Sequence, residues 1–78
     1  MKMEKFDPLN GSIAHVLNFL GEGWSMLIIR EAFFGIRRFE EFQTHLGIAR
    51  NILTTRLKRL CDNGILERVP IKEGAKRH

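Results

Sequence analysis

The stretch RFEEFQTHLGIARNILTTRLKRLCDN, residues 38–63, is the part of the chain that decides the fold. Phe39, Phe42 and Leu46 recur at the spacing of one helix face, which predicts a short helix. Gly47 interrupts this pattern after about two turns. The residues that follow return to a helical spacing, so the stretch is predicted to fold as a short helix, a turn and a longer helix.

The longer helix is predicted from about Arg50 to Asn63. At about 100° per residue, Leu53, Leu57 and Leu60 fall within about 60° of arc and form its buried edge. The opposite face and its flanks carry mostly hydrogen-bonding and cationic side chains: Asn51, Thr54, Thr55, Arg56, Lys58 and Arg59. An ordinary amphipathic surface helix would also show two such faces. In combination with a short helix and a glycine turn, the pattern is typical of a helix-turn-helix.

The composition changes after Gly64, where a strand is predicted over residues 65–71. Pro70 restricts this strand to a sheet edge or a strand end. Residues 72–74 (Lys-Glu-Gly) have the composition of a turn, and residues 76–78 are predicted to begin a returning strand. The predicted fold is mainly α with a small β-hairpin, a winged helix-turn-helix whose basic wing is truncated by the end of the chain.

Two further helices are predicted before this stretch, after an irregular lead-in at residues 1–11. Ser12 can cap the first helix, whose apolar stripe is Ile13, Val16, Leu17 and Leu20. The second opens near Trp24 and ends at Gly35, and its all-round hydrophobicity predicts a central helix. The large aromatic side chains are predicted to be core: Trp24, Phe33, Phe34, Phe39 and Phe42. Residues 12–78 are predicted to be one winged helix-turn-helix domain, incomplete at its C-terminus.

Length and charge limit the function classes. The chain has 78 residues and a net charge of +4, which indicates a single small domain and excludes a large multi-lobed enzyme. Residues 1–47 have a net charge of −1 and residues 48–78 of +5, so a polyanion is expected to bind the second half. No apolar run is long enough for a membrane span or a signal sequence, and the protein is predicted to be cytoplasmic.

The basic half and the helix-turn-helix together predict binding to double-stranded DNA. Asn51 can bond an adenine edge, the threonines can contact a thymine methyl group or a phosphate, and Lys58 or Arg59 can reach guanine or phosphate. Arginines and the bases of the wing are expected to hold phosphates. The candidate DNA-binding residues are Arg37, Arg38, Arg50, Asn51, Thr54, Thr55, Arg56, Lys58, Arg59, Lys72, Lys76 and Arg77.

Other chemistry has weak support in the sequence. Cys61 is either a redox-sensitive thiol beside basic residues or a small packed hydrophobe. His15, His45, Cys61 and His78 do not have metal-ligand spacing, so neither a metal nor a cofactor is expected. No nucleophile has a base and an orienting partner, so the protein is not expected to be an enzyme. A small-molecule effector between the helices has no support.

The chain resembles the HxlR-type winged helix-turn-helix regulators, a MarR-like bacterial family, over residues 13–68. The residues that carry the resemblance are Gly21, Trp24, the run FGIRRFEE at residues 34–41, and LTTRLKRL at residues 53–60. The resemblance implies a homodimer that binds a two-fold operator and acts as a repressor or an activator. It also implies that residues 50–59 form the recognition helix and residues 72–77 the wing.

Three departures accompany this resemblance. Gly11-Ser12 stand where many members have a Cys-Pro pair that senses oxidants, and Ala49 stands where many have a serine N-cap. A frayed helix start, or capping by water or phosphate, is therefore expected at Ala49. Complete members continue past the wing into a helix that helps to build the dimer, so this chain is interpreted as truncated or partial. A winged-helix module that binds protein and not DNA is the alternative function.

Overall fold

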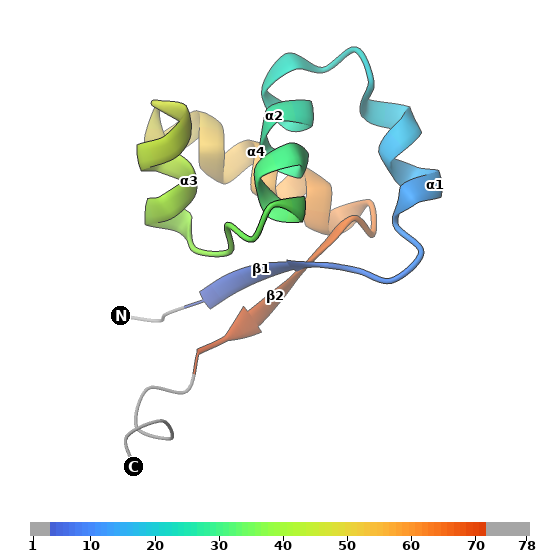
Figure 1. The fold of residues 1–78 in the computed structure, drawn as a ribbon. Coiled ribbons are helices and arrows are strands. Elements are labelled where there is room, and N and C mark those ends of the chain that lie inside the picture. The colour runs from blue at the N-terminus through green and yellow to red at the C-terminus, as the bar shows by residue number, and fades with distance from the viewer. Residues whose placement is uncertain (1–3, 72–78) are drawn as a thin grey trace.

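The computed structural model describes residues 4–71, which form a group of short helices above a pair of strands (Figure 1). The elements in chain order are β1 (Glu4–Pro8), α1 (Ile13–Val16), the 3₁₀ helix η1 (Leu17–Phe19), α2 (Gly23–Phe33), α3 (Phe39–Leu46), α4 (Arg50–Asp62) and β2 (Leu66–Pro70). The prediction of a mainly helical fold with a small antiparallel β element, as in a winged helix-turn-helix, is confirmed. In the described part of the chain, no helix is both long and apolar enough to cross a bilayer.

The helix-turn-helix is formed by α3 and α4, as predicted. Gly47 ends α3 in the left-handed region, with φ of 64°, where a side chain would be strained. Its N–H donates to the Gln43 carbonyl at 2.9 Å, which closes the last turn. Leu53, Leu57 and Leu60 of α4 are buried in the core, so the predicted inner edge of this helix is confirmed.

The N-terminal segment is a strand, and its interpretation as an irregular lead-in is wrong for Glu4–Pro8. β1 pairs with β2 in antiparallel register, with Phe6 opposite Arg68. Phe6 is buried with 6% of its surface exposed, and its N–H donates to the Arg37 carbonyl at 2.8 Å. The partner observed for β2 is therefore β1. The predicted turn with Lys72 and the predicted returning strand with Lys76 and Arg77 lie outside the described residues.

The first predicted helix is short, and of its predicted apolar stripe only Val16 packs against the core. α1 and η1 together span only Ile13–Phe19. Ile13, Leu17 and Leu20 are 66%, 62% and 65% exposed, whereas Phe19, which the stripe omitted, is buried. The helical spacing was predicted correctly, but this segment packs through Phe19 and Val16 only.

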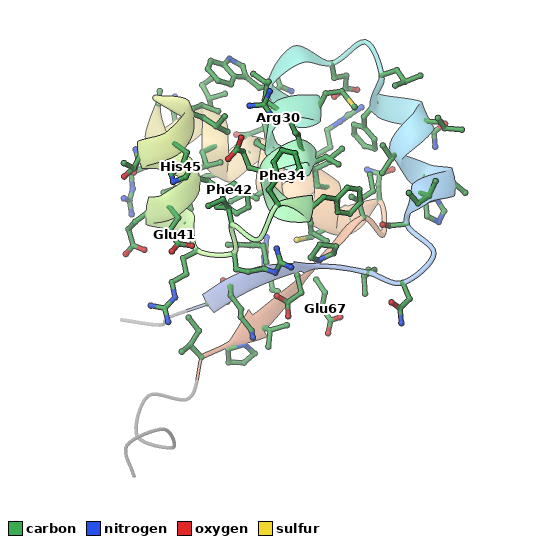
Figure 2. All side chains as sticks on the ribbon, viewed as in Figure 1. Arg30, Phe34, Glu41, Phe42, His45 and Glu67 are labelled. Atoms are coloured by element: carbon green, nitrogen blue, oxygen red, sulfur yellow. The ribbon has the colours of Figure 1, made fainter. Side chains whose placement is uncertain are left out.

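α2 is central but is not packed all round. Ser25, Ile28, Ile29 and Ala32 are buried, while Trp24, Phe33 and Phe34 are exposed to 38%, 44% and 78%. The prediction that the aromatic side chains are core is therefore wrong for these three and confirmed for Phe42, which projects from α3 toward α2 (Figure 2). Phe39 is half-buried against the core.

One polar contact connects α2 to α3. Glu31 accepts a hydrogen bond from Arg30 at 2.9 Å, and its other carboxylate oxygen lies 3.3 Å from His45 Nδ1. Arg30 holds the pKa of Glu31 below its ordinary value, and His45 adds to this effect. The contact sets α3 against α2 on the side away from the strands (Figure 2).

Candidate nucleic-acid interface

The outward face of α4 presents the predicted base-reading residues to solvent. Asn51, Thr54, Thr55 and Lys58 are all exposed, on the side of the helix opposite the buried leucines. A helix is narrow enough to enter the major groove of DNA, where amide, hydroxyl and ammonium groups can contact base edges. This face therefore has both the shape and the chemistry that base contact requires.

The two threonines have their hydroxyl hydrogens occupied within the helix. Thr54 Oγ1 donates to the Arg50 carbonyl and Thr55 Oγ1 to the Asn51 carbonyl, each at 2.9 Å. The hydroxyl oxygens keep their lone pairs, and the methyl groups remain apolar contacts. In these rotamers the threonines can accept a hydrogen bond from a base or contact a thymine methyl group. They cannot donate a hydrogen bond to a phosphate, because both hydroxyl groups already donate to carbonyls of the helix.

Lys58 has a partner that a phosphate could replace. Its Nζ lies 3.0 Å from Asp62 Oδ2 at an i, i+4 spacing, and both side chains are more than half exposed. Exposed pairs of this kind contribute about 0.3–0.5 kcal/mol. Lys58 is therefore held only weakly on the outward face.

Arg37 is engaged within the fold. Its Nη1 donates to the carbonyls of Ala32 and Ile36, at the end of α2, and its Nε lies 3.2 Å from Asp7 Oδ1. These contacts join β1 to the connection between α2 and α3. The arrangement favours a structural role over the predicted phosphate contact, and the sequence had no signal that Asp7 would lie beside Arg37.

The start of α3 is set by Glu41. Its carboxylate accepts the backbone N–H groups of Arg37 and Arg38 at 3.3 and 3.2 Å, and these bonds hold its pKa below the ordinary value. Arg38 itself is exposed at the N-cap position of α3. Arg50, at the start of α4, lies over the Phe39 ring at 5.2 Å from its centroid. Arg38 and Arg50 therefore provide positive charge at the N-terminal ends of α3 and α4.

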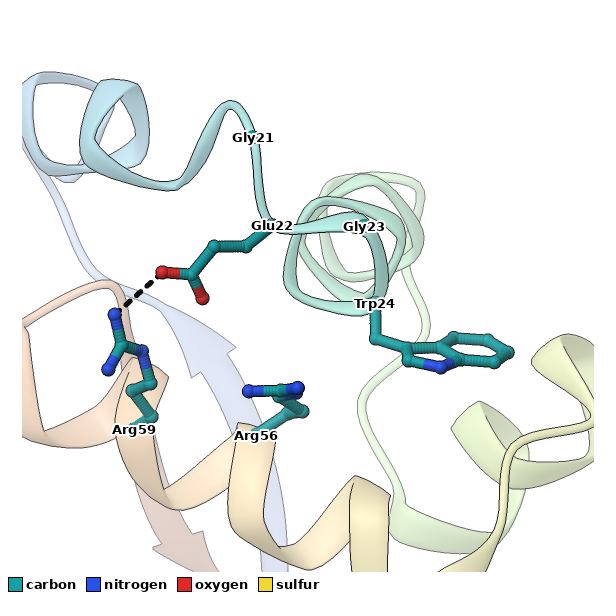
Figure 3. Close-up of a pocket in the computed structure, with 6 residues that line it drawn as sticks. All are labelled: Gly21, Glu22, Gly23, Trp24, Arg56 and Arg59. Atoms are coloured by element: carbon teal, nitrogen blue, oxygen red, sulfur yellow. Dashed lines mark hydrogen bonds and ion pairs between the residues drawn. The ribbon is translucent and has the colours of Figure 1, made fainter.

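Arg59 and Arg56 occupy the flank of α4 that faces α2 (Figure 3). Arg59 Nη2 lies 2.6 Å from Glu22 Oε2, and its guanidinium sits over the Phe19 ring at 5.2 Å. Arg56 is half-buried beside it. The sequence indicated two basic residues here, but it did not indicate that Glu22, 37 positions away, would hold one of them.

The start of α4 has no side-chain cap, as the alanine at position 49 predicts. Ala49 is extended, with φ of −64° and ψ of 144°, and makes no side-chain cap. An N-cap side chain would normally satisfy one of the first N–H groups of the helix. Water or a phosphate remains the predicted partner for them.

Cys61 lies at the edge of the core. It is half-buried against the core residues, and burial raises the pKa of its thiol, although Arg68 works in the opposite direction. The raised pKa favours the packed-hydrophobe interpretation over the redox-sensitive one. Among residues 4–71, no three His, Cys, Asp or Glu side chains gather as a metal site would require.

Comparison with known proteins identifies relatives of this arrangement. The family model described as HxlR-like helix-turn-helix matches residues 19–78. Uncharacterized HTH-type transcriptional regulators of Mycobacterium bovis and Mycobacterium tuberculosis are 45% identical over 67 residues, which are 86% of this chain and 42% of theirs. One of Synechocystis is 40% identical over 57 residues, covering 72% of this chain and 42% of that protein. The chain thus spans less than half the length of these relatives. No solved structure matches it significantly.

Proposed function

Because the chain belongs to the HxlR-like helix-turn-helix family, we propose that it is a sequence-specific DNA-binding regulator of transcription. In this proposal α4 enters the major groove of an operator and reads bases, and the protein is not an enzyme. The observation that carries the proposal is the exposure of Asn51, Thr55 and Lys58 on the outward face of a helix that follows a glycine turn.

We further propose that the regulator acts as a homodimer on a two-fold operator in the cytoplasm. Exposed apolar side chains of α1, of η1 and of the residue that follows η1, namely Ile13, Leu17 and Leu20, support a protein contact on that side of the molecule. Two copies would place their α4 helices about one turn of DNA, roughly 34 Å, apart. Binding at such a site near a promoter would repress the gene, or activate it where the contact recruits polymerase.

Selection of bound duplexes from a random pool tests this function. A palindromic consensus is expected, and fluorescence anisotropy should then show an affinity for that duplex that falls with salt. Asn51→Ala should weaken binding to the consensus by about 1–3 kcal/mol and leave binding to a scrambled duplex unchanged. Equal loss on both duplexes would contradict a base-reading role for Asn51.

The alternative, a winged-helix module that binds protein and not DNA, is favoured by one observation. Arg37 and Arg59 are both held by carboxylates of the same chain, so the face carries less available charge than the sequence predicted. Failure to bind any duplex, even at low salt, would support this alternative and overturn the proposed function.

A further inference from the structure

A hollow lies between the start of α2 and the flank of α4. It is lined by Gly21, Glu22, Gly23, Trp24, Arg56 and Arg59. Figure 3 shows Arg56 between Arg59 and Trp24 along this hollow, with the Glu22 carboxylate turned toward Arg59. Two cationic groups, one anionic group and an indole therefore share one open depression.

The charges in the hollow are unequal. Glu22 is 2.6 Å from Arg59, so this acid compensates one of the two guanidinium groups. Within residues 4–71, Arg56 makes no ion pair and no side-chain hydrogen bond. One positive charge is thus left beside an exposed indole, whose N–H is a hydrogen-bond donor only. This combination suits an oxyanion.

Position on α4 identifies the source of that oxyanion. Arg56 and Arg59 lie beside the outward face that carries Asn51 and Thr55. When the outward face of a helix lies in the major groove, its flanks lie next to the phosphate backbone. A guanidinium group matches a phosphate with two parallel hydrogen bonds.

We propose that this hollow binds a backbone phosphate of duplex DNA through Arg56, and that the Glu22 carboxylate competes with the phosphate for Arg59. The inference rests on the proposed function, because it assumes that α4 contacts DNA. It assigns Glu22 a role that lowers affinity: the acid holds Arg59 in the free protein and is displaced, or repels the phosphate, when DNA binds.

The contacts around Glu22 hold its carboxylate in place to compete with a phosphate for Arg59. Ser25, which is fully buried, donates from its Oγ to Glu22 Oε1 at 3.2 Å, so the carboxylate is held from the α2 side. Phe19 supports Arg59 from the other side through its ring face. A glutamine at position 22 keeps one acceptor oxygen, which can receive the Ser25 bond, and it replaces the oxygen that faces Arg59 by an uncharged NH₂ group. Glu22→Gln therefore keeps the shape of the side chain and releases Arg59 from its carboxylate partner.

Two readouts on the whole chain test the proposal. Anisotropy with a labelled duplex at several salt concentrations gives affinity and salt slope, and fluorescence of Trp24, the single tryptophan, reports the hollow directly. The variants are Glu22→Gln, Arg56→Gln and the charge-matched control Glu67→Gln, which removes an exposed acid on β2 away from the hollow (Figure 2). Circular dichroism melts confirm that each variant folds.

Glu22→Gln should bind duplex roughly two- to fivefold more tightly, the value of a half-exposed ion pair. Its log affinity should fall more steeply with log salt, by about 0.9, because one more phosphate contact forms. Arg56→Gln should bind more weakly, with a shallower slope and a smaller Trp24 response to DNA. Glu67→Gln should leave the slope and the Trp24 response unchanged.

Several results would overturn the inference. If folded Glu22→Gln binds duplex with unchanged or weaker affinity, Glu22 does not compete with a phosphate. If Arg56→Gln leaves the salt slope of duplex binding unchanged, Arg56 does not bind a phosphate. Inorganic phosphate is also titrated alone, with Trp24 fluorescence as the readout. If it saturates the fluorescence change at millimolar concentration and does not weaken duplex binding, the hollow binds a free anion and not a DNA phosphate. If the wild type binds no duplex at all, the proposed function is overturned together with the inference.

Discussion

At the scale of single residues, formal charge and available charge differ. Arg37 and Arg59 are cations in the sequence, but one closes the end of α2 beside Asp7 and the other is bound by Glu22. Lys58, whose acid partner is one turn away in the same exposed helix, keeps more freedom. The positive charge available at the candidate interface therefore depends on ion pairs between residues far apart in sequence, which no local motif predicts.

Cys61 provides a test at this scale. Burial raises the pKa of its thiol, so at neutral pH a smaller fraction is thiolate, the reactive form, than in a free cysteine. We expect alkylation by iodoacetamide at pH 7 to be severalfold slower than for a cysteine peptide, and its pH midpoint to lie above the free value of about 8.5. Unfolding in urea should abolish the difference. Faster alkylation in the folded protein than in urea would restore the redox interpretation.

At the scale of elements, helices with local patterns were predictable and the sheet was not. α2, α3 and α4 follow spacings read within a dozen residues, and Gly47 ends α3 as its position predicts. β1 and β2 are separated by the whole helical region, so their pairing depends on contacts far apart in sequence. Asp7-Pro8 also resembles a turn, although Pro8 in fact ends an edge strand opposite Leu66.

Phe6 tests whether β1 belongs to the fold. Phe6→Ala should lower the free energy of unfolding by about 3 kcal/mol, because a buried ring on β1 is lost from the core. Phe6→Leu, which keeps most of the volume, should cost under about 1.5 kcal/mol and remain measurable if the alanine variant unfolds. Phe34→Ala is the control, since that side chain is 78% exposed. Urea titration gives all three values, and equal stability of wild type and Phe6→Ala would contradict the pairing of β1.

The start of α4 offers a change that should stabilise the element. Ala49 already has the extended backbone of an N-cap but lacks an acceptor side chain. Ala49→Ser should therefore raise the free energy of unfolding by about 1 kcal/mol in urea titration. Ala14→Ser, at an exposed position of α1, serves as the matched control and should give no gain. A gain of equal size in both variants would show that capping is not the cause.

At the scale of the whole molecule, part of the apolar surface lies outside the core, in the segment that follows β1. Ile13 of α1, Leu17 of η1 and Leu20 directly after η1 are each more than 60% exposed, while Phe19 is buried. Except for Val16, the apolar stripe that the sequence predicts faces outward, because periodicity identifies an apolar face without identifying what covers it. In the proposed homodimer, a second copy covers this face.

Leu17 tests that assembly. Leu17→Glu places a charge in the centre of the exposed stripe, and a charge buried without a partner strongly disfavours association. We expect the wild type to sediment as a dimer at micromolar concentration and Leu17→Glu as a folded monomer, with a melting temperature that no longer depends on protein concentration. Asn18→Glu adds the same charge at the next exposed position and should leave the dimer intact, since in the 3₁₀ helix η1 it is rotated from Leu17 by about 120°. Bound to a palindromic duplex, the wild type should show two chains per site with cooperativity, and Leu17→Glu should bind each half-site independently.

A wild type that stays monomeric both in solution and on the palindrome would contradict the dimer. If Leu17→Glu and Asn18→Glu dissociate the dimer equally, the contact between the two copies is not centred on the apolar stripe.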